Sequence, residues 1–483
     1  MILKYAIFEK AFFIKVIIVF LHSGCPQKEE SNMLEKVFKL KEHNTTVKTE
    51  IIAGLTTFLS MAYILAVNPS ILGTVMNPSG VFVATALASA IATFVMAFMA
   101  NYPIALSAGL GLNAYFAYTV CLGELAAEGE NAFRICLTAV FVEGIIFLLM
   151  SLVKFREKII NSIPQNLKFG ISAGIGLFIA FIGLRGANVI IPDESTTVAL
   201  GDFADADVVL CLVGLIIIVV LEHFKVTGSV LIGILATWIL GMIAETTGWY
   251  TAGHVFPDFS QGLNQISGIS KTAFQFDFGW AASHFVQFIA IVFSFLYVDI
   301  FDTVGTVVGV ADKADLLDEN GNLPKVGAVF MSDAVGTVTG SCLGTSTVTS
   351  FVESSAGVAA GGRTGLTALT TAVMFLISLV LSPVFLAIPS FATAPALIYV
   401  GMLMVSSAKN ITFDGDLADT LGAYFALVMM PLSYSIATGI MFAVLGWVLV
   451  KIFIGKIKDI SPVMWIVFIM FAVRIAALVT DFQ

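Results

Sequence analysis

The chain has 483 residues, of which 58% are hydrophobic and only 12% are charged. Ordinary soluble domains carry about 25% charged residues, so this composition excludes a soluble enzyme or a soluble binding module. The net charge is −9, and the basic residues are spread over short segments, which argues against a nucleic-acid partner. Apolar runs close to the ~20 residues that cross a bilayer recur along the chain. The sequence therefore predicts a multi-pass membrane protein.

The first 32 residues differ from the remainder. An apolar run at 14–21 is preceded by scattered lysines, as in a signal sequence. Lys28-Glu29-Glu30 lies just before Met33 and is compatible with the codons AAG-GAG-GA, a purine-rich ribosome-binding sequence. We expect Met33 to be the native start and residues 1–32 to be a mis-called or disordered extension.

Fourteen candidate spans follow one another along the chain. Two of them, 103–121 and 345–359, are short and rich in glycine, so we expect broken helices there. A further apolar stretch at 463–479 contains Arg474, and the sequence leaves open whether it crosses the membrane or lies at its surface. The fourteen spans are 51–72, 81–100, 103–121, 132–152, 167–187, 206–222, 227–246, 284–310, 326–342, 345–359, 364–387, 393–408, 417–433 and 435–454.

The distribution of basic residues predicts the orientation. Positive charge gathers in cytoplasmic loops, and here three basic clusters fall on one side of the predicted spans while the loops of the other side are acidic. The amino terminus is therefore expected in the cytoplasm and the protein in the cell (plasma) membrane. The three clusters are Lys36, Lys39, Lys41 and Lys48; Lys154, Arg156, Lys158 and Lys168; and Lys451, Lys456 and Lys458.

A weak internal repeat has an offset of 225 residues. Ile163-Pro164 opens the fifth span and Ile388-Pro389 opens the twelfth, and the same offset places Gly176 on Gly401. Seven spans would then repeat seven spans, and an odd number makes the two units inverted. The two glycine-rich segments fall third in each half, where broken helices meet at a binding site near the bilayer midplane.

Carboxylates inside two of the spans are the first candidates for chemistry. A charged side chain at the bilayer centre costs about 2.5–3.5 kcal/mol and therefore needs a partner or a wet cavity. Asp299, Asp302 and Thr303 share one helical face by their i, i+3, i+4 spacing, and Glu353 stands among hydroxyl and small residues. Binding a polar solute is one interpretation, and hydrogen bonding that holds the helices together is the other. Asp333 fits the second interpretation better.

Outside these carboxylates, the sequence offers one further candidate for ligand binding and no recognisable catalytic or metal site. Asn113 follows the Gly109-x-Gly111 break, where its amide is able to read the edge of a heterocycle or to cap its own backbone. The glycine patterns lack the Lys-Ser/Thr end of a phosphate loop, and neither a zinc site nor a hydrolase constellation is recognisable. The sequence thus predicts no enzyme and no cofactor.

Four ordered motifs resemble the AzgA-like purine permeases, the adenine, guanine and hypoxanthine branch of the nucleobase–cation symporter-2 family. The resemblance covers the chain from about Met33 to the end. The motifs read TEIIAGLTTFLSMAYI at 49–64, AGLGLNAYFA at 108–117, FDTVGT at 301–306 and TSFVESSAG at 349–357.

The resemblance implies a fold and a set of site residues. The fold is the all-α, seven-plus-seven inverted repeat shared with uracil permease, with core segments 49–152 and 284–387, gate segments 156–246 and 391–458, and an additional segment at 463–483. Asp299 is similar to the acidic residue that contacts the base, Glu353 to its partner and Asn113 to the third polar residue. Asp302 and backbone groups around Ala62 are weaker candidates.

The expected function is uptake of hypoxanthine, guanine or adenine with a proton, through alternating exposure of a central site. Carboxylates accept the N–H groups of a purine, and aromatic side chains such as Phe301, Phe351 or Tyr115 cover its ring. Burial disfavours the charged form of a carboxylate, so Glu353 and Asp299 are able to carry the proton. Coupling to Na⁺, a different solute such as uracil, xanthine or an anion, a channel, and a homodimer all stay open at this point.

Overall fold

The structure is a computed structural model that describes residues 34–152, 163–257, 259, 262–313 and 323–480; within these ranges, the side chains at 152, 262–264, 301–302, 304–309, 311–313 and 476–480 are outside the description. The interpretation of residues 1–32 as an extension therefore lies outside the described residues. The same holds for the basic residues at 154–158.

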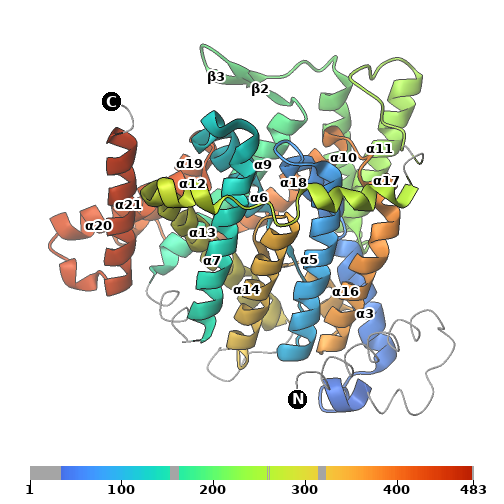
Figure 1. The fold of residues 1–483 in the computed structure, drawn as a ribbon, viewed down its shortest axis with the longest axis horizontal. Helices are drawn as coiled ribbons and strands as arrows, with labels where there is room; N and C mark the ends of the chain where they lie inside the picture. The colour runs from blue at the N-terminus through green and yellow to red at the C-terminus, as the bar shows by residue number, and fades with distance from the viewer. Residues whose placement is uncertain (1–33, 153–162, 258, 260–261, 314–322, 481–483) are drawn as a thin grey trace.

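Helices make up most of the described chain, in the order that the apolar runs predict (Figure 1). The first half comprises α3 (Val47–Met61), α4 (Ile64–Leu72), α5 (Pro78–Met99), β1 (Leu106–Ala108), α6 (Leu110–Ala114), η1 (Tyr115–Glu124), η2 (Ala126–Asn131), α7 (Ala132–Leu152), α9 (Gln165–Gly186), β2 (Ile190–Asp193), β3 (Thr197–Leu200), α10 (Ala206–His223) and α11 (Ser229–Thr246). Two connecting helices follow, η3 (Gly262–Lys271) and α12 (Phe278–Ser283). The second half comprises α13 (Phe285–Lys313), α14 (Val326–Leu343), β4 (Val348–Ser350), α15 (Ser354–Ala359), α16 (Gly365–Ser378), η4 (Leu379–Leu381), α17 (Ser382–Phe385), α18 (Ser390–Val405), η5 (Ser406–Asn410), α19 (Leu417–Leu432), α20 (Ile436–Phe453), η6 (Ile457–Asp459) and α21 (Pro462–Thr480).

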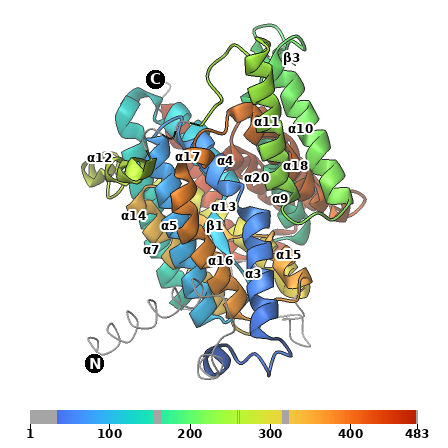
Figure 2. The same cartoon turned by 90° about the vertical axis from the view of Figure 1, so that its right-hand side faces the viewer.

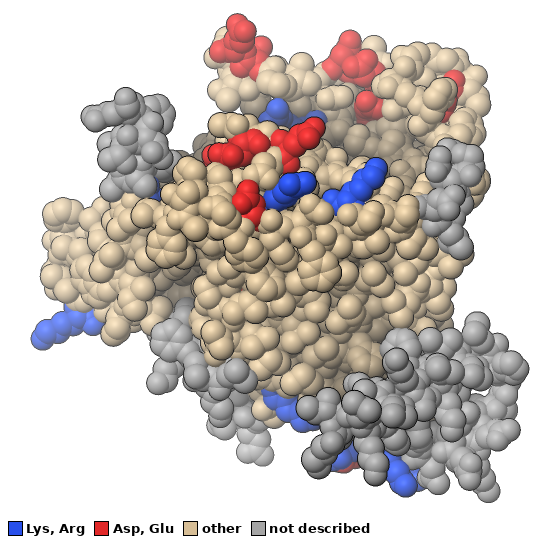
Figure 3. All heavy atoms as spheres, viewed as in Figure 1, with Lys and Arg blue, Asp and Glu red and all other residues tan. Residues whose placement is uncertain are grey.

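Length and composition identify the membrane-crossing helices. Ten helices of the described part are long and apolar enough to cross a bilayer, and three shorter apolar helices accompany them at Phe285–Ile300, Leu417–Leu432 and Pro462–Ile475. Each of the fourteen predicted spans corresponds to one, two or three consecutive elements. The stretch at 463–479 is also helical, as α21. Figure 3 shows a broad band without charged side chains across the middle of one face, as expected of a surface in contact with lipid.

The two glycine-rich segments are shorter helices than expected, because each begins as a strand. β1 pairs with β4 in an antiparallel two-stranded sheet, in which Ser107 lies opposite Thr349. Hydroxyl side chains hold this sheet inside the helices: Ser89 of α5 is 2.7 Å from the hydroxyl of Ser107. Extended backbone is tolerated at this depth because it is paired and enclosed by protein.

The inverted repeat is visible in the long helices α9 and α18. Pro164 occupies the N-cap of α9 and Pro389 that of α18, as the 225-residue offset predicts. The two equivalent glycines face each other, because a Cβ atom on Gly176 would lie 2.6 Å from the carbonyl oxygen of Gly401, and one on Gly401 would lie 2.5 Å from that of Gly176. The repeat axis thus passes close to this glycine contact.

The helices pack in two groups, which Figure 2 shows side by side. In one group α3, α5, α7, α14 and α16 pack against one another, with α13 and α15 added. In the other, α9 packs against α18 and α19, α10 packs against α11 and α18, and α19 packs against α20. The contact of α9 with α19 mirrors that of α18 with α10, as an inverted repeat requires.

An ion-pair cluster fixes the start of α19 to the end of α20. Asp416 caps α19 by accepting from the backbone of Ala418, and it also accepts from Lys451 at 2.8 Å and Lys456 at 2.9 Å. The hydrogen bond from Lys451, followed by that from Lys456, holds the pKa of Asp416 well below its usual range. A depressed carboxylate pKa contributes stability above the unfolded value of about 4, and that contribution is lost as the pH falls through the folded value.

We therefore expect Asp416→Asn to destabilise the protein at pH 7 by roughly 2 kcal/mol, the value of hydrogen bonds to charged groups. The deficit should persist down to about pH 4 and shrink below it. Thermal unfolding of purified protein across pH measures this effect. Asp414→Asn, at an exposed neighbouring carboxylate, is the matched control, and a deficit that does not change between pH 7 and pH 3 would contradict the assignment.

Candidate functional site

The segment at 345–353, which leads through β4 into α15, is the centre of a buried polar network. Within the described part of the chain, its hydroxyl and carboxyl groups contact four other spans. Thr345 accepts from Asn68 of α4 at 2.9 Å, and Ser350 donates to Asp333 of α14 at 3.0 Å. Except for the partly exposed Glu353, the polar side chains of this segment are buried. Such a network in an apolar bundle fixes one arrangement of its helices, because every polar group needs a partner.

Glu353 stands at the N-cap of α15 and is partly exposed. Its Oε1 accepts a hydrogen bond of 2.5 Å from the hydroxyl of Tyr63, which lies in the short break between α3 and α4. A carboxylate that accepts from a phenol is equally able to accept an N–H donor of a ligand. The first and tenth predicted spans thus meet at a hydrogen-bonding pair that a small polar solute is able to join or displace.

Asp299 is fully buried on α13, the helix that packs against β4 and α15. Its Oδ1 accepts from Thr303 at 3.3 Å, one turn along the helix. The polar face predicted from the i, i+4 spacing is therefore present for these two residues. Asp302 lies on the same helix, but its side chain and that of Phe301 lie outside the described residues.

Asn113 lies on the short helix α6 and is fully buried. Its Oδ1 accepts from Ser346, and its amide nitrogen donates to the carbonyl of Ala108 at 3.4 Å. The amide nitrogen thus caps its own segment, as one of the two interpretations predicts, while the amide oxygen contacts the 345–353 segment. Ligand recognition by Asn113 would require one of these bonds to be exchanged.

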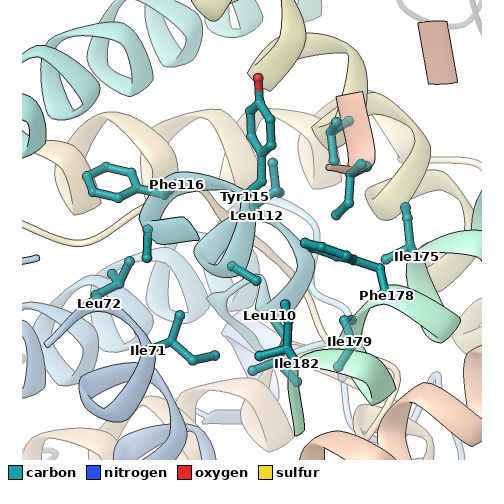
Figure 4. Packing of buried hydrophobic residues seen from close by; sticks show 14 of the residues in the cluster. Ile71, Leu72, Leu110, Leu112, Tyr115, Phe116, Ile175, Phe178, Ile179 and Ile182 are labelled. Carbon is teal, nitrogen blue, oxygen red and sulfur yellow. The ribbon is translucent and has the colours of Figure 1, made fainter. Parts of the chain in front are cut away.

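Apolar side chains hold α6 between the two helix groups (Figure 4). Leu110 and Leu112 of α6, with the rings of Tyr115 and Phe116 of η1, lie between Ile71 and Leu72 of α4 on one side and four α9 residues on the other: Ile175, Phe178, Ile179 and Ile182. The segment that carries Asn113 is therefore in contact with both groups. A relative movement of the groups would change its surroundings directly.

Ala62 is buried and forms the C-cap of α3, where the α-helix is interrupted for two residues before α4 begins at Ile64. Its N–H donates to Phe58 at 2.7 Å, and its carbonyl accepts from Leu65 at 3.1 Å. Both backbone groups of Ala62 are thus engaged within the helix, while the neighbouring Tyr63 side chain reaches Glu353. Tyr63 was missed from the sequence, although a tyrosine beside a predicted span break is a usable signal.

Buried carboxylates also occur outside the two segments that the sequence singled out. Glu143 of α7 is fully buried and accepts from Thr347 at 3.1 Å, although it lies inside the predicted span 132–152. Glu50 of α3 is also fully buried and accepts from the backbone of Thr364 and from the hydroxyl of Thr367 at the start of α16. Both act within the protein as acceptors that join neighbouring helices.

The fold and the polar centre define the class of the protein. The two halves of the chain are related by an inverted repeat, each half contributes helices to both groups, and paired half-strands meet at a shared polar centre. This arrangement is found in membrane transporters. The transmembrane domain of the cyanobacterial bicarbonate transporter BicA has this fold, with a TM-score of 0.60 and 16% identity over 81% of this chain and 96% of that domain. SLC26A9 matches with a TM-score of 0.59 and 12% identity over 88% of this chain and 70% of that protein. The predicted seven-plus-seven fold is confirmed.

Sequence relatives assign the family. The profile of the Permease family that covers xanthine and uracil permeases matches residues 48–442, and the chain belongs to this family. The guanine/hypoxanthine permease PbuO of Bacillus subtilis is 43% identical over 442 residues, which cover 91% of this chain and 99% of that protein. The adenine permease AdeP of Escherichia coli is 39% identical over 455 residues, which cover 94% and 98%. The resemblance to purine permeases seen in the motifs is thereby confirmed, and the chain is a multi-pass membrane permease.

Proposed function

We propose that the protein imports purine nucleobases, namely hypoxanthine, guanine or adenine, by proton symport. The observation that carries the proposal is the Tyr63–Glu353 pair at the break of the first span, beside the α13 helix that bears Asp299. Relatives with 39–43% identity that are named for purines support the substrate class. A purine offers N–H donors to the two carboxylates and ring acceptors to the Asn113 amide.

Aromatic side chains near these polar groups favour a planar ligand. Phe351 is buried two residues before Glu353, and Tyr115, two residues after Asn113, packs edge-on against Phe295 at a centroid distance of 4.9 Å. Both residues stand among the aromatic candidates of the sequence analysis. Offset or edge contacts with a purine ring contribute about 0.5–1.5 kcal/mol beyond the burial of area.

In the proposed cycle, the core segments 49–152 and 284–387 move against the gate segments 156–246 and 391–458. The helix packing supports this division, because α9, α10, α11, α18, α19 and α20 pack chiefly among themselves. The α6 helix, which lies between α4 and α9, would slide along the gate during the movement. The site would then be exposed to one side of the membrane at a time.

Proton coupling is assigned to Glu353 and Asp299. Uptake of a proton neutralises a carboxylate that is costly to keep charged in an apolar bundle, so protonation and substrate binding favour the same state. The amino terminus is placed in the cytoplasm and the protein in the plasma membrane. Acidic side chains gather at the end of the molecule that carries β2 and β3, opposite the amino-terminal end (Figure 3). This distribution supports the proposed orientation.

Uptake of labelled hypoxanthine by cells that lack their own purine permeases tests the function. We expect saturable uptake that unlabelled guanine or adenine suppresses, that rises as the external pH is lowered, and that a protonophore abolishes. Strong competition by uracil, xanthine or bicarbonate, and none by purines, would overturn the substrate assignment. If uptake depends on Na⁺ at constant pH, the coupling ion is Na⁺ and not H⁺. Uptake that does not saturate with substrate concentration would indicate a channel.

A further inference from the structure

The helix α21 lies outside the two seven-span repeats, yet it carries a buried arginine. Arg474 is 8% exposed although it stands in an otherwise apolar helix. Its Nη1 donates to the hydroxyl of Ser294 on α13, and its Nη2 pairs with Oε1 of Glu124 at the end of η1. One guanidinium group thus binds two different spans.

Those two spans are the ones that carry site candidates. Ser294 precedes Asp299 by five residues on α13, and η1 continues the α6 helix that carries Asn113. The positions of Ser294 and Glu124 therefore constrain the axial position and the rotation of both helices. A shift at either contact would displace α13, which carries Asp299, or the continuous α6–η1 segment, which carries Asn113.

Aromatic packing extends this contact between α21 and α13. The ring of Phe471, one turn before Arg474, lies 5.5 Å from that of Phe293 and 5.7 Å from that of Tyr297, in edge-to-face geometry. Phe471 and Tyr297 are buried. Two consecutive turns of α13 thus contact α21.

The chemistry explains why an arginine is found at this position. A buried cation destabilises a protein unless its charge is paired and its donors are satisfied. The planar guanidinium has donors in a fixed fork, so it is able to bind a carboxylate and a hydroxyl in two directions at once. A lysine offers a single nitrogen, so it cannot contact the hydroxyl of Ser294 and the carboxylate of Glu124 from two separate donor atoms as arginine does.

We propose that Arg474 is a positioning residue of the transport site: through Ser294 and Glu124 it holds α13 and η1 in the register that places Asp299 and Asn113 for substrate binding. This inference rests on the proposed function for its substrate. It assigns to α21 a role in affinity rather than a role as a peripheral anchor.

The test compares Arg474→Met with Lys458→Met, which neutralises an exposed lysine just before α21. Hypoxanthine KM and Vmax are measured in cells, with Vmax normalised to folded protein. We expect Arg474→Met to raise KM about tenfold, as expected for small displacements at a site, and Lys458→Met to leave KM unchanged. Arg474→Lys should restore KM only in part. Because KM does not depend on the amount of protein, a lower yield alone cannot produce this result.

A second measurement is independent of transport. Cys121 lies on η1 one turn before Glu124 and is 2% exposed. If Arg474 holds η1 in place, Arg474→Met should accelerate maleimide labelling of Cys121 at least several-fold, detected by peptide mass spectrometry. Should Arg474→Met fail to fold, the double variant Arg474→Gln with Glu124→Gln leaves no unpaired buried charge and should show the same increases in KM and labelling.

Unchanged KM together with unchanged Cys121 labelling, in a variant that is merely less stable, would overturn the inference. If the unmodified protein takes up no purine, the proposed function fails instead. In that case the Cys121 experiment still decides whether Arg474 positions η1.

Discussion

Glu353→Gln is expected to lower hypoxanthine uptake, measured as Vmax/KM, by about a hundredfold, as for the loss of a hydrogen bond to a charged group. Gln keeps the shape of the side chain and its acceptor oxygen, so the contact with Tyr63 at 2.5 Å can persist. It removes the negative charge that attracts a purine N–H and the group that would carry the proton. The loss should therefore affect transport far more than folding.

Two controls make this result specific. Glu130→Gln changes an exposed carboxylate in the loop segment η2 and should leave uptake unchanged. Tyr63→Phe removes the phenol that donates to Glu353 but keeps the carboxylate, so it should lower uptake less than Glu353→Gln does. Normal uptake with normal pH dependence in Glu353→Gln would remove Glu353 from the mechanism. A loss of folded protein, seen as a lower melting temperature, would instead make its role structural.

Gly176→Ala is expected to destabilise the protein by about 1–3 kcal/mol, the usual cost of inserting a methyl group into a packed interior. The new Cβ atom would lie 2.6 Å from the carbonyl oxygen of Gly401, a backbone atom that cannot turn away. The helices α9 and α18 would have to separate along the repeat axis. Gly401→Ala should have a similar effect, because its Cβ atom would meet the carbonyl of Gly176 at 2.5 Å.

The matched control lies on the same helix. Gly186 ends α9 and has no atom within 4 Å of an added Cβ, so Gly186→Ala should be neutral or slightly stabilising. Thermal unfolding of purified protein measures all three single variants. The double variant at 176 and 401 should differ from the sum of the single effects, because the two residues share one contact. Equal melting temperatures for Gly176→Ala and Gly186→Ala would contradict the close approach of the two helices.

The candidate site could be predicted in part. Carboxylates and amides inside apolar runs are visible in a sequence, and α13, which carries Asp299, contacts both the α6 helix of Asn113 and the α15 helix that Glu353 caps. Their partners were not predictable, because Tyr63 and Glu353 are 290 residues apart and Asn113 and Ser346 are 233 apart. No local pattern relates positions at such separations. Glu143 was overlooked for another reason, since a single Glu in a long apolar run barely alters its hydropathy.

The sequence by itself determined the membrane class, the order of the spans and the inverted repeat of α9 and α18. Lipid imposes the first two features locally, because a run of about twenty apolar residues crosses a bilayer whatever its neighbours are. The repeat was visible because equivalent prolines and glycines recur 225 residues apart. Only the tertiary structure decided that the two glycine-rich segments pair as β1 and β4, that the 345–353 segment collects the buried polar groups, and that Arg474 of α21 meets Glu124 and Ser294. These contacts depend on which helices lie side by side, and the demand of buried polar groups for partners selects one arrangement among many.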